Sequence, residues 1–318
     1  MTPASPDPAE HPTLRPVEWL LLGYLLATTV CAALRLTRQP AAAWVIAANA
    51  LSTGLVVLVA RPGLGPFARG VREICPLLLL PALYPALDIL NNFGGVSVHD
   101  ALVRRWEQAL FGAELSRTWW QAHPSRFWST VLHGAYFAYY AVLAGPLIYF
   151  LARRRIHAAR RLVNWLIPTF LACYAIFLGF PVAGPYYEFP RPDGAFLANP
   201  MARLVYATLE RGSAYGAAFP SSHVAATLVA TAAAFAGSRP LGLCLTIPAA
   251  LLTVGVVYCQ MHYAVDALAG VALAAVVVGV GLRLERSGVS GSRDAGTGGR
   301  PRSGAHLSPA SHSAEIAT

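Results

Sequence analysis

Two histidines and one aspartate are the residues of this chain best suited to chemistry. His223 ends a Phe-Pro-Ser-Ser-His segment, and His262 follows 39 positions later, four positions before Asp266. Each of them stands at the edge of a strongly apolar stretch. Imidazole and carboxylate groups transfer protons and act as nucleophiles. Their position beside apolar segments predicts phosphate chemistry on a lipid at a membrane surface.

The residues before His223 have the features of a helix N-terminus. Ser221 or Ser222 is a favoured N-cap, and Pro220 precedes the turn where a helix would begin. The unpaired N–H groups and the positive dipole end of such a terminus bind phosphate. A histidine in that first turn can donate a proton to phosphate or to a leaving alkoxide. The alternative is that these residues only mark the start of a helix at the membrane interface.

His262 and Asp266 are spaced so that they lie on one face of a helix, within hydrogen-bonding reach. A carboxylate that accepts a hydrogen bond from one ring nitrogen fixes the tautomer, which makes the other nitrogen a better nucleophile. Aspartate is costly inside an apolar segment and is usually functional or paired there. The alternative is an interfacial histidine beside an aspartate that reaches for lipid headgroups.

The composition predicts a membrane protein. Of the 318 residues, 56% are hydrophobic and 12% are charged, which is about half the charged fraction of a typical soluble domain. The net charge of +9 comes from arginines in loops and in the C-terminal tail, where they orient helices and meet anionic lipid, so nucleic-acid binding is not expected. The cysteines and histidines lack the spacing of a metal site, and neither a metal nor another cofactor is expected.

Eight apolar segments have about the length that a bilayer requires. They are Val17–Leu34, Ala42–Ala60, Ile74–Leu90, Phe127–Leu151, Leu162–Val182, Ser222–Gly237, Leu241–Tyr258 and Ala264–Leu284. Three prolines and an aspartate interrupt the third, which predicts a kinked or re-entrant segment. The polar ends, residues 1–16 and 287–318, are expected to be disordered cytoplasmic tails.

Basic residues in short loops orient these spans. The densest cluster lies between the fourth and fifth spans and consists of Arg153, Arg154, Arg155, Arg160 and Arg161. It predicts a cytoplasmic loop there, with both termini in the cytoplasm and the two histidines at the outer face. Four arginines disagree with this orientation because they fall outside: Arg35, Arg38, Arg104 and Arg105.

Together the two motifs resemble those of the phosphatidic-acid-phosphatase type 2 superfamily of membrane lipid phosphatases and phosphotransferases. In that family a Pro-Ser-x-His segment and a later His-x-x-x-Asp segment form the site on nearby helices, and both segments are present here. The resemblance implies that His262 attacks phosphorus to give a phosphohistidine, with Asp266 orienting it. It also implies that His223 protonates the leaving group, and that Ser221 and Ser222 help to bind the phosphate.

The chain departs from the phosphatase branch of that family at its cations. That branch has a Lys-x6-Arg-Pro element before the first motif and a Ser-Arg pair before the nucleophilic histidine. Here Arg191-Pro192 is the only Arg-Pro dipeptide in the relevant loop, and Gly184 stands in the place of the lysine. Gly255 and Val256 stand where the Ser-Arg pair is expected. These losses favour transfer of a phospho-headgroup to another alcohol over hydrolysis.

The remaining pattern is similar to the branch of inositol-phosphorylceramide synthases and sphingomyelin synthases, an inositolphosphotransferase-like branch. That branch keeps both histidines and the aspartate without the full phosphatase pattern. The segments that begin at Phe219 and Tyr258 resemble its two motifs, and Phe180–Tyr187 resembles the proline–aromatic element before them. Trp106–Gly112 is similar to a segment common in bacterial members. The resemblance covers about residues 80–285.

Other residues are candidates to complete the site. Phosphate needs cationic partners, and the outer loop offers Arg191, Arg203 and Arg211, of which Arg191 is the first candidate by its order along the chain. For each arginine the alternative is contact with lipid headgroups or solvent. Polar residues around the outer end of the third span are candidates for binding a polar acceptor, or else they only solvate the helix end: Asp88, Asn91, Asn92, His99 and Asp100.

We therefore expect an all-α polytopic membrane bundle of about eight helices with a six-helix catalytic core. Residues 17–72 supply two accessory spans, and residues 73–286 form the catalytic domain. The protein is expected to act on a phospholipid or lipid-phosphate headgroup, with an alcohol or water as acceptor, at the outer face of a bacterial plasma membrane. Two alternatives remain: a lipid-phosphate or polyprenyl-diphosphate phosphatase, and a non-catalytic transporter or structural membrane protein.

Overall fold

The computed structural model describes residues 14–92 and 96–294, and in these ranges the regular structure is helical, without a strand. The helices are α1 (Pro16–Arg35), α2 (Ala42–Val59), α3 (Pro66–Asn92), α4 (Asp100–Phe111), α5 (Leu115–Ala122), α6 (Arg126–Phe137), α7 (Tyr139–Ala152), α8 (Ile156–Gly179), α9 (Pro185–Glu188), α10 (Gly194–Leu197), α11 (Pro200–Gly212), α12 (Ser222–Gly237), α13 (Arg239–Tyr258) and α14 (Ala264–Asp294). The chain divides into two compact units, Met1–Gly279 and Val280–Thr318. The arrangement described below is that of the first unit.

The described helices confirm the predicted all-α membrane fold. Six of them are long and apolar enough to cross a membrane: α1, α2, α3, α8, α13 and α14. The pair α6 and α7 forms a further candidate span, bent by 42° at a short break. α12 is apolar but has only 16 residues. These elements coincide with the eight segments predicted from the sequence.

The third predicted span is one uninterrupted helix. α3 continues through Pro76, Pro81 and Pro85, residues that membrane helices tolerate because neighbouring groups satisfy the freed carbonyls. At the other end of the chain, α14 runs to Asp294 and so enters the stretch predicted to be disordered. Residues 287–294 contain no proline, so the helix can continue past the apolar segment. The rest of both predicted tails, residues 1–13 and 295–318, lies outside the described residues.

Two of the arginines that disagree with the predicted orientation have local partners. Arg35 donates a hydrogen bond to the carbonyl of Leu90, one of the last carbonyls of α3, which the helix itself leaves unpaired. Arg104 forms an ion pair of 2.6 Å with Glu114.

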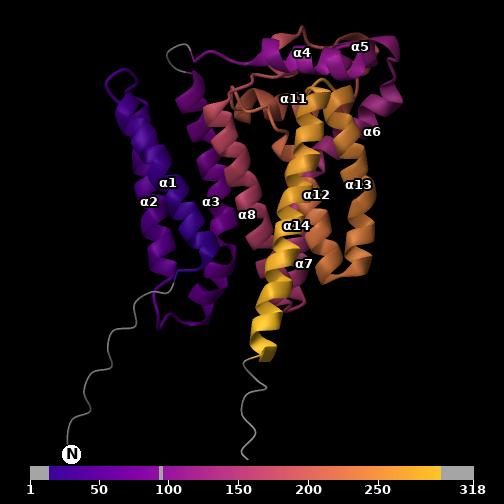
Figure 1. Cartoon of the computed structure of the whole chain (residues 1–318). Coiled ribbons are helices and arrows are strands. Elements are labelled where there is room, and N and C mark those ends of the chain that lie inside the picture. The colour runs from indigo at the N-terminus through magenta and orange to yellow at the C-terminus, as the bar shows by residue number, and fades with distance from the viewer. Residues whose placement is uncertain (1–13, 93–95, 295–318) are drawn as a thin grey trace, which may run out of the picture. The chain divides into compact units, whose positions relative to one another are not determined.

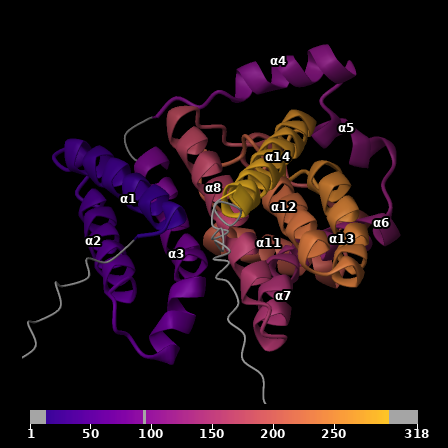
Figure 2. The ribbon, with the colours of Figure 1, turned by 60° about the horizontal axis from the view of Figure 1, so that its bottom comes forward.

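α12 lies at the centre of the bundle and is built from small residues. It packs against α7, α8 and α13 (Figure 2). Its sequence SHVAATLVATAAAFAG is rich in alanine, and the side chains from Val224 to Ala234 are mostly buried. Small side chains let membrane helices approach closely. The start of α12, which carries His223, is thereby fixed by neighbours on several sides.

α4 and α5 run across one end of the bundle, roughly at right angles to the long helices (Figure 1). This is the end at which α8 finishes, because the backbone N–H of His99, just before α4, donates to the carbonyl of Pro181, just after α8. α4 is strongly amphipathic: Asp100, Val103 and Glu107 are buried, whereas its remaining side chains are mostly exposed.

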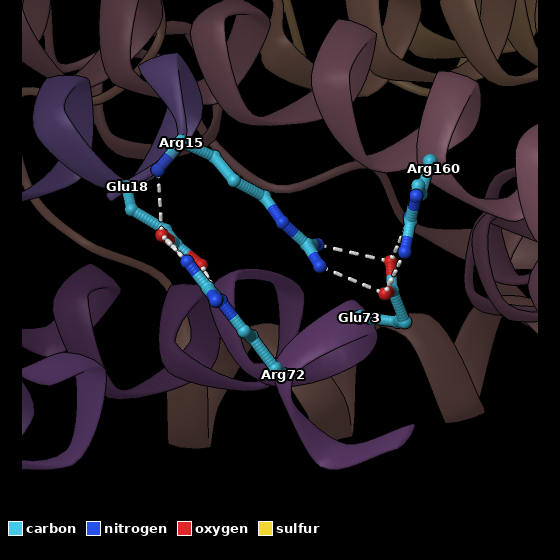
Figure 3. A network of polar contacts seen from close by, with 5 residues as sticks. All are labelled: Arg15, Glu18, Arg72, Glu73 and Arg160. Carbon is cyan, nitrogen blue, oxygen red and sulfur yellow. Dashed lines mark hydrogen bonds and ion pairs between the residues drawn. The ribbon is translucent and has the colours of Figure 1, made fainter. Parts of the chain in front are cut away.

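A network of ion pairs closes the opposite end, where α8 begins (Figure 3). Glu73 on α3 binds Arg15 at 2.9 Å and Arg160 at 2.6 Å, and Glu18 on α1 binds Arg72 at 2.7 Å. Both carboxylates are buried, at 2% exposure for Glu18 and 7% for Glu73. The network joins α1 and α3 to α8, and α8 separates it from the histidines by its full length.

Candidate active site

His223 and His262 meet at one end of a partly open cavity in the bundle. His223 lies in the first turn of α12, and His262 lies in the short connection between α13 and α14. The centroids of the two imidazole rings are 5.9 Å apart, and both side chains line the cavity. This separation allows the two rings to contact one phosphoryl group from different sides.

Two oxygens lie near Nδ1 of His262. The carbonyl oxygen of Ala218 is 3.0 Å from it, and Oδ2 of Asp266 is 3.5 Å from it. When Nδ1–H donates to Ala218, the proton resides on Nδ1, and Nε2 keeps the lone pair needed for attack. Oδ2 of Asp266 also accepts a hydrogen bond of 2.9 Å from the backbone N–H of Tyr263, which fixes the carboxylate beside the ring.

A backbone hydrogen bond joins the two motifs. The N–H of Ser221 donates to the carbonyl of Asp266 at 2.9 Å, and the Ser221 hydroxyl caps α12 by accepting from the N–H of Val224. Ser222 lines the cavity next to His223. Gly270 makes this approach possible, since a Cβ atom there would lie 2.6 Å from the Ser221 carbonyl oxygen. The N-terminus of α12 is therefore set against α14 at the site itself.

Two tyrosines that sequence reasoning did not identify hold the His223 ring. Tyr136 stacks on it with a centroid distance of 4.7 Å, and Tyr139 lies at 4.4 Å with the rings tilted. The two tyrosines flank Ala138, where the chain bends from α6 into α7. The bend brings both rings to one side, against His223. The only signal in the sequence is the aromatic stretch Tyr-Phe-Ala-Tyr-Tyr at residues 136–140.

The cavity extends from the histidines into the apolar part of the bundle. Its volume is about 630 Å³, and α3, α7, α8 and α11 form its walls. Far from the histidines it is lined by leucines and aromatic residues such as Leu77, Leu166 and Phe170. Among the described residues that line it, none is an arginine. A site with two polar histidines at one end and an apolar remainder suits an amphipathic ligand.

The positions of the missing phosphatase cations are closed by packing. Gly184 has a φ of +88°, and a Cβ atom there would lie 2.7 Å from the Cβ of Ala218, so a lysine does not fit. At Gly255 a Cβ atom would lie 3.1 Å from the carbonyl oxygen of Leu132. Val256 is fully buried. The residues that replace the lysine and the Ser-Arg pair of the phosphatases are therefore part of the close packing around the site.

The predicted phosphate-binding arginine lies behind the cavity wall. Arg191 forms an exposed ion pair of 2.7 Å with Glu210 and donates a hydrogen bond of 3.1 Å to the hydroxyl of Tyr186. Tyr186 lines the cavity, and Arg191 does not. Arg203 and Arg211 are exposed on α11 and do not line it either. The structure thus brings the histidines, Asp266 and the serines together without these three arginines.

The predicted acceptor-binding residues contact other parts of the protein. Asp88 accepts a hydrogen bond of 3.1 Å from the N–H of Tyr215, Asn91 donates to the carbonyl of Phe177, and His99 stacks on Phe180. Asp100 is buried and accepts hydrogen bonds from Ala183, Gly184 and Tyr263. Neither Asp88 nor Asp100 lines the cavity. The side chain of Asn92 lies outside the described residues.

Comparison with known proteins identifies the family. The model of the PAP2 superfamily matches residues 101–280, a range that contains both histidine motifs. No curated protein and no solved structure matches the chain. The resemblance to this superfamily is confirmed, whereas the inositolphosphotransferase-like branch stays a prediction.

Proposed function

The chain belongs to the PAP2 superfamily, and on that premise we propose that it is an integral membrane phosphotransferase for phospholipid or lipid-phosphate headgroups. The observation that carries this proposal is the cavity of about 630 Å³ with His223 and His262 at one end and mostly apolar walls elsewhere. The phosphate of a lipid would lie at the histidines, and its hydrocarbon would lie among the leucines and aromatic rings.

The geometry supports a reaction in two steps. In the first, Nε2 of His262 attacks phosphorus, the bond from phosphorus to the leaving oxygen breaks, and His223 gives that oxygen its proton. In the second, the neutral His223 takes the proton of an acceptor alcohol, whose oxygen attacks phosphorus and breaks the P–N bond. The Ala218 carbonyl and Asp266 stabilise the Nδ1–H of His262 in both steps. The N-terminus of α12 faces the phosphate charge.

The charge of the cavity favours a phosphodiester substrate, and hence transfer over plain hydrolysis. A phosphodiester carries one negative charge, whereas a phosphomonoester carries about −1.5 to −2 near neutral pH. No arginine is among the described residues that line the cavity, and the positions of the phosphatase lysine and arginine are taken by the closely packed Gly184 and the buried Val256. One charge is better matched to a helix N-terminus and two imidazoles. With water as acceptor and a phosphomonoester as substrate, the same site would act as a phosphatase.

We place the site on the outer side of a bacterial plasma membrane, within a catalytic domain of residues 73–286. The basic cluster at Arg153–Arg155 precedes α8, whereas the loop that leads to His223 follows it. Arginine-rich short loops stay in the cytoplasm. A cysteine introduced at exposed Tyr187 should therefore react with an impermeant maleimide in intact cells, and one at exposed Arg154 should react only after lysis.

The experiment that tests the function follows the phosphorus atom. The protein in lipid is given phosphate-labelled phosphatidylinositol, phosphatidylcholine, phosphatidic acid and a polyprenyl diphosphate, and label is sought in the protein, in a new lipid and in free phosphate. Wild type should become labelled and make a new labelled lipid, and His262→Ala should do neither. His157→Ala is the control, because His157 is exposed at the start of α8.

The other outcomes separate the alternatives. Release of free phosphate without a new lipid would assign the phosphatase activity. Absence of turnover on the whole panel, with His262→Ala equal to wild type, would support a non-catalytic membrane protein.

A further inference from the structure

The underside of α4 carries two buried acidic side chains that the reaction does not use directly. Asp100 and Glu107 are 3% and 0% exposed. They are seven residues apart, which is about two helical turns, so both point to the same side of α4. A buried carboxylate costs several kcal/mol unless it is well hydrogen-bonded. Two of them on one short helix therefore need hydrogen-bond donors from neighbouring segments.

Asp100 binds the two segments that flank the nucleophile. Its Oδ2 accepts a hydrogen bond of 2.8 Å from the N–H of Ala183, and its Oδ1 accepts one of 2.8 Å from the N–H of Gly184. Oδ1 also accepts a hydrogen bond of 3.0 Å from the hydroxyl of Tyr263, the residue directly after His262. All of Tyr263 is buried. One carboxylate thus ties the loop after α8 to the connection that carries His262.

Glu107 holds the next residue of the same connection. Its Oε1 accepts a hydrogen bond of 2.8 Å from the N–H of Ala264, the first residue of α14. This N–H belongs to the helix end that has no partner within its own helix. α4 therefore forms hydrogen bonds with both residues that follow His262, namely Tyr263 and Ala264.

The carbonyl that binds His262 is connected to Asp100 as well. Ala218 donates its N–H to the carbonyl of Val182 at 2.9 Å, and Val182 immediately precedes the pair of N–H groups that Asp100 binds. Gly184 then packs directly on the Cβ of Ala218. The connection that carries His262 and the segment next to its hydrogen-bond acceptor are thus both tied to the same carboxylate.

We propose that Asp100 and Tyr263 are positioning residues for the nucleophile His262, and that α4 clamps the site through them. This inference rests on the proposed function, because it assigns a role in the attack of His262 on phosphorus. The clamp fixes the direction of the ring toward the phosphate. A carboxylate is required because three donors converge on it, and an amide would turn its NH₂ group toward one of them.

The first test compares Asp100→Asn and Tyr263→Phe with wild type in the same detergent. Asp100→Asn should lower kcat and the single-turnover rate of phosphoenzyme formation by about 10- to 100-fold, by analogy with the loss when partners that orient a metal-binding histidine are removed. KM should change by less than threefold. Tyr263→Phe, which keeps the ring and loses only one hydrogen bond, should lower kcat by roughly 3- to 10-fold. The double variant should lose less than the product of the two losses, since both changes break one contact.

A matched control comes from the same extramembrane segment. Glu114 lies just after α4, where it pairs with Arg104 and Arg117 and has no hydrogen bond to the connection that carries His262. Glu114→Gln should keep kcat within twofold of wild type. Thermal melting of each variant separates loss of positioning from loss of the fold, and Tyr263→Phe serves as the decisive variant if Asp100→Asn does not fold.

Orthovanadate, a phosphate-like anion, gives a readout that needs no lipid. Wild type should bind it, His262→Ala should not, and Asp100→Asn should bind it at least about tenfold more weakly because the ring is no longer held in place. Folded Asp100→Asn and Tyr263→Phe variants with the kcat and vanadate affinity of wild type would overturn the clamp and leave the proposed function intact. Failure of wild type both to bind vanadate and to form a phosphoenzyme would instead overturn the proposed function, and the clamp with it.

Discussion

At the scale of single residues, the two histidines have different surroundings, which fit different roles. His262 has a carbonyl at 3.0 Å and a carboxylate at 3.5 Å from Nδ1, an arrangement that supports nucleophilic attack by Nε2. His223 lies between two tyrosine rings and has His262 as its nearest described imidazole. Aromatic neighbours hold the ring without fixing its proton, which suits a group that gives the proton away.

The role proposed for His223 predicts a dependence on the leaving group. His223→Gln should lower turnover of a phospholipid by about 10²- to 10⁴-fold, the usual contribution of a general acid. For a nitrophenyl phosphodiester, whose leaving group needs no proton, the loss should be below about tenfold. The measurement is kcat/KM for both substrates. Equal losses on the two substrates would assign His223 to phosphate binding instead.

The close packing at Gly184 predicts a second effect. Gly184→Ala should destabilise the protein by roughly 1–3 kcal/mol, because it combines a positive φ with a Cβ contact of 2.7 Å to Ala218. Gly194→Ala is the control, since Gly194 has a φ of +56° but open space around its Cβ position, and should cost only the backbone strain of about 1 kcal/mol. Thermal melting in detergent measures both. Equal shifts in melting temperature for the two variants would show that Ala218 moves away from the added methyl group at little cost.

At the scale of elements, α4 carries a carboxyl group with an unusual proton affinity. Burial raises the pKa of Glu107 to about 7; the nearby Asp266 and Glu114 also raise this pKa, and the hydrogen bond from Ala264 opposes the rise. One oxygen of this group, Oε2, is buried without a partner among the described residues. The neutral form is thus the one that the fold favours.

The raised pKa of Glu107 makes stability depend on pH in a defined direction. The folded protein binds this proton more tightly than the unfolded chain does, so the stabilisation is complete below about pH 4.5 and is lost as the pH rises to about 7. Relative to Glu107→Gln, which does not titrate, wild type should lose roughly 1–3 kcal/mol between pH 4.5 and 7.5. Melting temperatures of the two proteins over this range measure the difference. Parallel curves would contradict the prediction.

At the scale of the whole described bundle, polar groups close both ends of α8 and leave the apolar cavity between them. At one end α4 binds the connections that carry the motifs, and at the other Glu18 and Glu73 bind arginines of α1, α3 and α8. α3, which these ion pairs tie to α8, also forms one wall of the cavity.

The ion-pair network predicts a change in stability that an exposed pair does not share. Glu73→Gln leaves Arg15 and Arg160 without their common carboxylate and should destabilise the protein by about 1–2 kcal/mol, between the values for an exposed and a buried pair, because Glu73 is buried whereas the two arginines are partly exposed. Glu210→Gln breaks the exposed pair with Arg191 and should cost less than about 1 kcal/mol. Thermal melting measures the loss of stability in both variants. Similar small shifts in melting temperature would show that water reaches the Glu73 network.

Several features of the fold could be predicted from the sequence because they depend on neighbours along the chain. The length of an apolar run decides whether a helix can cross a bilayer, so all eight segments coincide with helices. Ser221 caps α12 because its hydroxyl needs only the N–H three residues later. The four-residue spacing of His262 and Asp266 brings them to 3.5 Å by local geometry.

The tertiary structure alone decided what surrounds these motifs. The carbonyl that binds His262 lies 44 residues earlier in the chain, and the Asp100 carboxylate that binds Tyr263 lies 163 residues earlier. A backbone carbonyl has no residue type to reveal it, and a buried acid on an amphipathic helix resembles a solvated one until its partners are known. Order along the chain likewise offered Arg191 as the phosphate cation, whereas packing placed it behind Tyr186 and against Glu210. Local spacing determines which side chains can react, and contacts between distant segments determine how each is held.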